Sequence, residues 1–494
     1  MAYTFVDYER DAERYCEAAS LQWYRYRLGV TISPDLARLF DDYGFLFGTD
    51  LIEQLGEEPI GPNRRRALVA FAVQGRLDRA TCEARLALAE QEAAASVVWE
   101  GEAVPWRAIP ARLANLADPS RRHRLDEARR GVTAAQLPLR RASHLAARAV
   151  YEELGWRDPV ARWDELLGLH LADLEAVAAA VLRQSQEGYF DLLLAALRLA
   201  GMESGDAWSA DLPWLARGAE HDSAFAGREL GATARRTLHW LGLRLEEQPW
   251  LALDLDRPPG TTLGSFCAAL DVPHDVRVVL SREGGWGDYA TLFTLLGRAE
   301  HLVNVDPAKP MPYRWLGNEV LGAGYAALLA GLIHDPVWLG EAVGLSDRAD
   351  FLQRARLAWL VQLRRDAALV RYEPRRLRSH PDEWEELQAL YAQELGEALG
   401  ARHFEPDFLS DDSDQPLPAA QRLLGAVFGE QLRAYLVHEL DEEWFRLPRA
   451  GRFLIELWRE GSRYTAEELA RFMGYAGYDA TPLLERIAGT AGRG

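Results

Sequence analysis

The chain has 494 residues, of which 48% are hydrophobic, and its 56 basic and 75 acidic side chains give a formal net charge of −19. This content supports one large or two closely packed domains with a sizeable core. The negative charge opposes nonspecific binding to nucleic acid and to anionic membranes, so we expect neither as a partner.

No segment approaches the roughly 18 uninterrupted apolar residues of a membrane span. The N-terminal segment is charged where a signal peptide would be apolar, and we therefore expect a cytoplasmic protein. The three cysteines, Cys16, Cys82 and Cys267, are far apart in the sequence. They offer neither a CxxC metal knuckle nor a disulfide framework, and we expect them to be buried thiols.

Taken in chain order, most segments show the three- and four-residue hydrophobic spacing of amphipathic helices. The clearest stripes lie in 136–155, 174–182, 228–246, 351–370 and 385–400. Alternating apolar residues are limited to 251–256 and 276–281, which predict strands of a small peripheral sheet. The sequence thus predicts a mainly α protein.

Two short patterns receive a structural interpretation. The basic run at 371–378 is interpreted as a solvated face between helices. Thr465, followed three residues later by Glu468, predicts a capping box at the start of one of the last helices. Neither pattern indicates a function.

The segment 256–339 has a more specific organisation. It contains a turn, a strand and a Gly-rich loop at 283–287, and two predicted helices follow. We expect the first helix from about Asp288 and the second from about Trp315. Two helices that follow one strand in this way can pack against each other.

This segment carries an ordered series of distinctive residues. They are Gly264, Phe266, Cys267, Pro273, Val276, Val278, Gly284, Gly285, Asp288, Thr291, Leu292, Gly297, Ala299 and His301. Further matches follow at 322–326, at 335–339 and from Leu423 to Glu468. The series resembles the gluzincin oligopeptidases of the oligoendopeptidase F and thimet oligopeptidase type, whose phrase reads G-x-F-C, P-x-x-V-x-V, then G-G-x-x-D-x-x-T-L-x-H-E-x-G-H-A-x-H.

The resemblance implies a mainly α, zincin-like oligopeptidase fold, with two helical halves around a deep channel and a small peripheral β-sheet. It suggests an N-terminal helical half at 1–200 and a metallopeptidase-like half at 201–494, packed intimately as one unit. The matching motifs lie in the last half of the chain. The first half resembles the family only in its helical character.

The residues that would hold the family's zinc are absent. In that family two His at i and i+4 and a Glu from the next helix bind the metal, while a Glu at i+1 activates the metal-bound water. This sequence has Thr294 and Arg298 at the two His positions, Leu295 at the general-base position, and Ala323 at the third-ligand position, about 29 residues after the first His.

These residue types do not suit the chemistry. Thr is a poor neutral ligand, Leu and Ala offer no lone pair, and Arg stays protonated and repels a dication. We therefore expect no zinc, no other cofactor and no catalytic residue at these four positions. In this respect the chain resembles a degenerate member of the family that lacks the HExxH zinc motif.

The sequence offers no other recognisable metal or catalytic device. No two of the 11 histidines are three, four or five residues apart. Scattered donors such as Glu300, His301, Glu319 and His334 are interpreted as helix-surface or core residues. The nucleophile elbow GxSxG, the Walker phosphate loop and the dinucleotide motif GxGxxG are all missing.

Three functional hypotheses follow. The first is a pseudoenzyme that keeps the metallopeptidase fold as a binding, scaffold or regulatory protein, with a peptide or protein partner in the channel. The second is an active oligopeptidase or other hydrolase with a non-standard site. The third is a helical interaction protein whose likeness to the family is accidental. The sequence does not decide the oligomeric state.

Arg298 is the candidate ligand contact. It places a permanent cation where the metal's charge would have been, so it could bind a carboxylate of a peptide or partner. The structural alternative is that Arg298 pairs with a nearby acid, Glu319 or Asp288, and keeps the two helices aligned.

Overall fold

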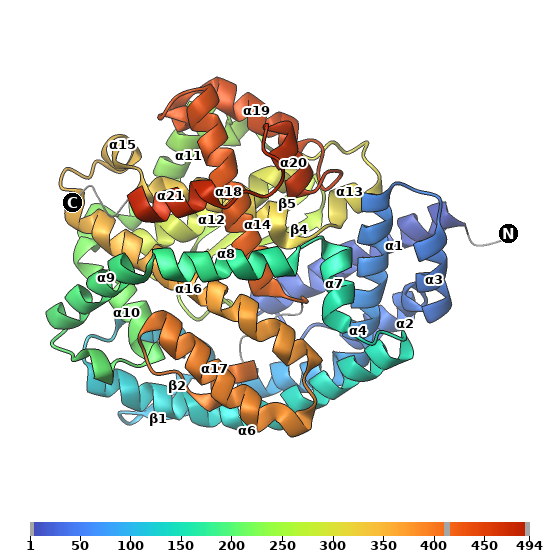
Figure 1. Cartoon of the computed structure of the whole chain (residues 1–494), viewed down its shortest axis with the longest axis horizontal. Coiled ribbons are helices and arrows are strands. Elements are labelled where there is room, and N and C mark those ends of the chain that lie inside the picture. Colours follow the sequence, from blue (N-terminus) through green and yellow to red (C-terminus); the bar gives the residue numbers. More distant parts are fainter. Residues whose placement is uncertain (1–3, 410–414, 490–494) are drawn as a thin grey trace. The chain divides into compact units, whose positions relative to one another are not determined.

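The computed structural model describes residues 4–409 and 415–489, which are mainly helical with two small sheets (Figure 1). The prediction of a mainly α protein is confirmed. The first part of the chain contains α1 (Phe5–Arg27), α2 (Leu36–Tyr43), α3 (Thr49–Glu57), α4 (Pro62–Ala94), β1 (Ser96–Trp99), β2 (Glu102–Pro105), α5 (Ile109–Asn115), α6 (Pro119–Glu153), α7 (Pro159–Leu167), α8 (Leu171–Gln184), α9 (Gln186–Leu199), α10 (Leu212–Arg217) and α11 (Leu230–Trp240).

The second part carries the three-stranded sheet and the segment of interest. Its elements are β3 (Leu251–Arg257), β4 (Phe266–Asp271), β5 (Asp275–Ser281), α12 (Trp286–Val303), α13 (Met311–Trp315), α14 (Glu319–Ala330), α15 (Pro336–Trp338), α16 (Ala349–Arg378), α17 (Trp384–Leu399), α18 (Pro418–Glu439), α19 (Pro448–Trp458), α20 (Ala466–Phe472) and α21 (Thr481–Gly489).

The chain forms two compact units, and each is assembled from three separate stretches. The first unit comprises Met1–Gly75, Glu220–Arg348 and Leu424–Glu485, and the second comprises Arg76–Ala219, Ala349–Leu423 and Arg486–Gly494. The division into 1–200 and 201–494 stays a prediction. All segments with specific family motifs before residue 340 fall in the first unit.

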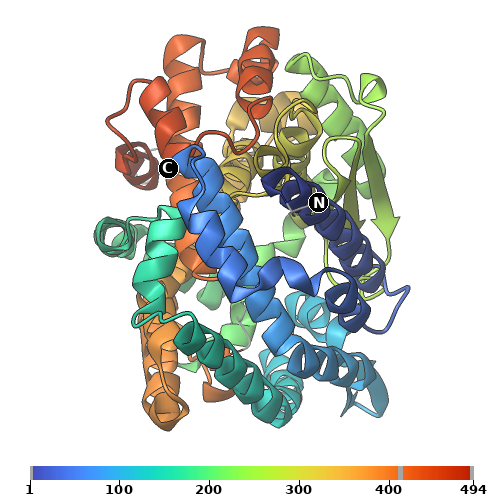
Figure 2. The same cartoon turned by 90° about the vertical axis from the view of Figure 1, so that its right-hand side faces the viewer.

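The sheet of the first unit has the strand order β3-β5-β4, with β5 parallel to β3 and antiparallel to β4. Both strands expected from alternation are present, and β4 is an additional strand that the sequence pattern did not predict. The central strand β5 buries Val276, Val278 and Val279 completely. Helix α1 runs beside the sheet, where Tyr24 contacts Phe266 edge to face (Figure 2).

The two predicted helices of the segment are present, with one corrected boundary. Helix α12 begins at Trp286, two residues before the expected start. The second helix does not begin at Trp315: the short helix α13 ends there, Leu316 is extended, and α14 begins at Glu319. Asn318 caps α14 by accepting a hydrogen bond from the Val320 amide at 3.2 Å.

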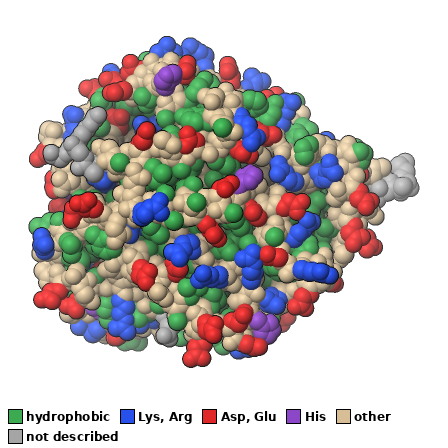
Figure 3. All heavy atoms as spheres, viewed as in Figure 1, with side chains coloured by type: hydrophobic (Ala, Val, Ile, Leu, Met, Phe, Trp, Pro, Cys, Tyr) green, Lys and Arg blue, Asp and Glu red, His purple; other side chains and the backbone are tan. Residues whose placement is uncertain are grey.

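The predicted capping box and the basic run at 371–378 can both be located in the structure. Thr465 and Glu468 form the predicted capping box of α20, with reciprocal bonds of 3.2 and 2.8 Å. In the basic run, the exposed Arg371 and Arg378 pair with Glu394 and Asp158, as a solvated face would. Acidic and basic side chains are interspersed on the face drawn in Figure 3.

Among the described residues, no single helix is long and apolar enough to cross a bilayer. The bent pair formed by 319–334 and 336–343 passes that test on length and composition alone.

Glycines bring the backbones of α12, α14 and α18 into direct contact. A Cβ added to Gly297 of α12 would lie 2.2 Å from the Tyr325 carbonyl oxygen of α14. A Cβ on Gly425 of α18 would lie 2.5 Å from the Ala323 Cβ. Because only glycine permits this approach, these positions fix how the three helices cross.

We expect Gly297→Ala to lower the free energy of unfolding by about 1–3 kcal/mol, since backbone atoms must move to admit the methyl group. Gly322→Ala on α14 is the matched control, because its added Cβ would meet only side-chain ends, Arg298 Nη1 at 3.4 Å and Glu319 Oε2 at 3.7 Å. At Gly322 the higher helix propensity of alanine, about 1 kcal/mol, should outweigh any steric cost, so we expect this variant to be at least as stable as the native protein. Urea unfolding of both variants measures the difference, and equal stabilities would contradict the prediction.

Candidate functional site

The Gly-rich loop before α12 is held by the first turn of that helix. Asp288 Oδ1 accepts hydrogen bonds from the amides of Glu283 and Gly284, at 2.9 and 3.1 Å. Asp288 is buried, and Arg282 lies 3.5 Å from its carboxylate. A carboxylate at a helix N-terminus that binds backbone N–H groups is favourably placed, so this residue orients α12.

The four positions at which the family would carry its catalytic groups lie on α12 and α14. Thr294 and Arg298 are one turn apart on α12, and the Thr294 hydroxyl donates to the Ala290 carbonyl at 2.8 Å. Leu295 and Ala323 are buried, with 7% and 9% exposure. Thr294 and Arg298 are half-buried, so the polar side chains at these positions are more accessible to solvent than the apolar ones.

Arg298 reaches across from α12 and donates from Nη1 to Glu319 Oε2 on α14. The sequence left Glu319 and Asp288 open as partners; the ion pair is with Glu319, while Asp288 binds the loop. Both side chains are about one-third exposed, 31% for Arg298 and 37% for Glu319. Solvent screening at that exposure limits the pair to about 0–1 kcal/mol of stability.

Behind this face the packing is aromatic. His301 is buried against Tyr325, with ring centroids 4.9 Å apart, and Tyr325 also contacts Trp458. Burial lowers the pKa of His301 to about 4, so the imidazole is neutral at physiological pH. The interpretation of His301 as a core residue agrees with these contacts.

The charges of Arg298 and Glu319 also affect the pKa of Cys267 on β4, which Arg298 lowers and Glu319 raises. Burial raises the pKa of its thiol to about 12, and burial likewise raises the pKa of Cys16. Both thiols are therefore mainly protonated at neutral pH. The three cysteines are partly buried, not fully buried as the sequence predicted.

The zinc ion that the family's motif would bind does not fit these residues. Thr294 already donates its hydroxyl proton to a helix carbonyl, and the Arg298 cation lies beside the Glu319 carboxylate. Within 4–409 and 415–489, no group of three or more His, Cys, Asp or Glu side chains is arranged to hold a metal ion. A dication here would face a fixed positive charge.

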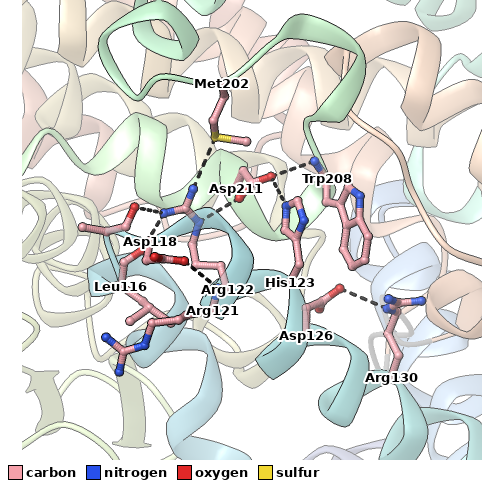
Figure 4. Close-up of polar contacts among 11 residues, drawn as sticks. Leu116, Asp118, Arg121, Arg122, His123, Asp126, Arg130, Met202, Trp208 and Asp211 are labelled. Carbon is pink, nitrogen blue, oxygen red and sulfur yellow. Dashed lines mark hydrogen bonds and ion pairs between the residues drawn. The ribbon is translucent and has the colours of Figure 1, made fainter.

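A second polar cluster, in the other unit, was not anticipated from the sequence (Figure 4). Asp211 is fully buried; its Oδ1 accepts from Arg122 Nε at 2.7 Å, and its Oδ2 lies 2.7 Å from His123 Nε2. The Trp208 amide donates to Oδ2 at 2.8 Å, and the His123 ring lies flat on the Trp208 ring at 3.9 Å. No local signal could have joined residues 88 or 89 positions apart.

This second cluster has the features of a structural core. Arg122 is fully buried and also donates to the carbonyls of Leu116 and Ala117, at 2.6 and 2.8 Å. The carboxylate oxygens of Asp211 are both engaged, and the imidazole is covered on one face by Trp208. The cluster therefore joins α6 to the segment that leads into α10.

Comparisons with known proteins connect this fold to a described class. No protein-family model matches the sequence, and no curated protein matches it. Among solved structures, a 3.1 Å X-ray structure of a protein provisionally assigned as oligoendopeptidase F matches with a TM-score of 0.61 and 15% identity, over 98% of this chain and 85% of that one.

A second match has the same provisional assignment and comes from Bacillus anthracis strain Ames. Its TM-score is 0.58 at 13% identity, over 98% of this chain and 84% of that one. The chain therefore has an oligoendopeptidase F-like fold, as the resemblance implied. The likeness extends over the N-terminal half, where the sequence carried no motif.

Proposed function

We propose that this chain uses an oligoendopeptidase-type fold to bind a peptide or protein partner without hydrolysing it, as a degenerate member of that class. The observation that carries the proposal is the Arg298–Glu319 ion pair. It lies on the α12–α14 face where the resemblance would require two zinc-binding His and a Glu. Arg298, Leu295 and Ala323 supply neither metal ligands nor a general base.

The same pair suggests how a partner would be held. Arg298 uses Nη1 for Glu319, and its guanidinium is partly exposed, so its other N–H groups can donate to a carboxylate of the partner. Glu319 competes for the cation. We therefore expect the site to select a free carboxylate, such as a peptide C-terminus or an acidic side chain, over an amide.

The metal content of the purified protein tests the loss of the zinc site. After dialysis against metal-free buffer, we expect less than about 0.1 equivalent of zinc by mass spectrometry, since a three-ligand site would retain its ion. About one equivalent, together with chelator-sensitive peptide cleavage, would instead support the alternative of an active oligopeptidase or other hydrolase with a non-standard site.

Peptide binding tests the role of Arg298. Fluorescence anisotropy would compare a set of peptides with free C-termini against the same peptides with amidated C-termini. We expect Arg298→Ala to weaken binding of the free-acid peptides at least about tenfold, as loss of a charge-assisted pair does. Arg452→Ala, which removes an exposed arginine of α19 in the same unit, is the matched control. Equal binding by Arg298→Ala and the native protein would rule out this role.

A further inference from the structure

A buried carboxyl on α12 faces an amide from the segment before β3. Glu300 has no solvent-exposed surface, and its Oε2 accepts hydrogen bonds from Gln248 Nε2 at 3.0 Å and from Asn304 Nδ2 at 3.1 Å. The other carboxyl oxygen of Glu300 and the amide oxygen of Gln248 are both buried and have no hydrogen-bond donor. Two acceptor oxygens thus lie on side chains that are already joined by one hydrogen bond.

Within the described part of the chain, no charged group compensates a negative charge on Glu300. Burial raises the pKa of the Glu300 carboxyl, and the bonds from Gln248 and Asn304 lower it. His301, next to it on α12, is itself buried and neutral at physiological pH. Next to Gln248, Glu246 and Glu247 are exposed, and Glu247 pairs with Arg244 at 2.8 Å.

Burying an unpaired carboxylate costs several kcal/mol of free energy. A protonated carboxylic acid avoids that cost and has an O–H group that can donate a hydrogen bond. We infer that Glu300 is a protonated carboxylic acid in the folded protein and donates its proton to the Gln248 amide oxygen, which closes a reciprocal acid–amide pair between α12 and residue 248. The protonated oxygen of Glu300 becomes a donor and the Gln248 amide oxygen accepts, so that a single hydrogen bond satisfies both atoms. This inference is independent of the proposed function.

The pair links folding to proton uptake. Burial raises the pKa of Glu300 from 4.5 to about 7. A carboxyl with a raised pKa in the folded state binds more protons there than in the unfolded chain. Its contribution is therefore fully present below pH 4.5 and is lost as the pH rises through about 7. The folding equilibrium should fall by up to a few hundredfold over this window from this group alone.

Glu300→Gln tests the inference, because a glutamine amide can donate to Gln248 at every pH. We expect urea unfolding midpoints of native protein and variant to agree near pH 5, and the variant to be the more stable at pH 8. Glu430→Gln is the control, since Glu430 is a buried carboxyl that pairs with Arg433 at 2.7 Å. This control should be less stable than the native protein at pH 8.

Infrared spectroscopy gives a second readout that does not need a stable variant. The native protein should show the carbonyl band of a protonated carboxylic acid near neutral pH, and that band should disappear at higher pH and in Glu300→Gln. If a water molecule instead bridges the two oxygens, Glu300 is ionised, the band is missing, and Glu300→Gln is destabilising at every pH. Either of these results would overturn the inference.

Discussion

A variant that combines Thr294→His, Arg298→His and Ala323→Glu is expected to bind about one equivalent of zinc, and the native chain is expected to bind less than about a tenth. Positions 294 and 298 are one turn apart on α12, so two imidazoles there leave the helix on one face. Removing Arg298 also removes the cation that repels the metal. Ala323 lies on α14 with its Cβ close to Gly425 of α18, so the new carboxylate must turn from that contact toward α12 to reach the metal.

Zinc content after dialysis and isothermal titration would measure this binding. The matched control moves one ligand back along α12: Thr291→His replaces Thr294→His, and the other two substitutions stay. We expect that control to bind zinc at least about tenfold more weakly, because its two imidazoles lie about two turns apart along α12 instead of one. A folded triple variant without zinc would show that the assigned register is wrong, and equal binding by the control would show that the binding is nonspecific.

The buried pair of Arg122 and Asp211 should dominate the stability of the second unit. We expect Asp211→Ala to lower the free energy of unfolding by about 3–5 kcal/mol, because it leaves Arg122 as an uncompensated charge. Both side chains have 0% exposure, and their atoms are 2.7 Å apart. The substitution also removes the acceptor for His123 and for the Trp208 amide.

Chemical denaturation checks this value against a control on the same helix. Arg121 pairs with Glu100, but both side chains are about 40% exposed (41% and 39%), so Arg121→Ala should cost no more than about 1 kcal/mol. The double variant Arg122→Met with Asp211→Leu should recover most of the loss, since it leaves no buried charge. A loss as small as that of Arg121→Ala would mean that Asp211 is not the carboxylate on which Arg122 depends.

The sequence alone went furthest where the signals are local. Hydrophobic spacing predicted the helical class, alternation predicted β3 and β5, and the spacing of Thr465 and Glu468 predicted a cap. The start of α14 was missed by four residues, because its boundary depends on the extended backbone at Leu316 and the cap at Asn318. Local propensity does not encode that break.

The prediction that metal ligands and a general base are missing from the four family positions rests on the sequence alone, because metal binding and proton transfer depend on residue type. Only the tertiary structure decided which side chains form ion pairs and hydrogen bonds with each other. Arg298 selects Glu319 over Asp288 because the glycine contacts of α12 and α14 set the crossing of the two helices. Arg122 meets Asp211, and Glu300 meets Gln248, across 89 and 52 residues. Such pairings depend on the packing of distant segments, which no local pattern records.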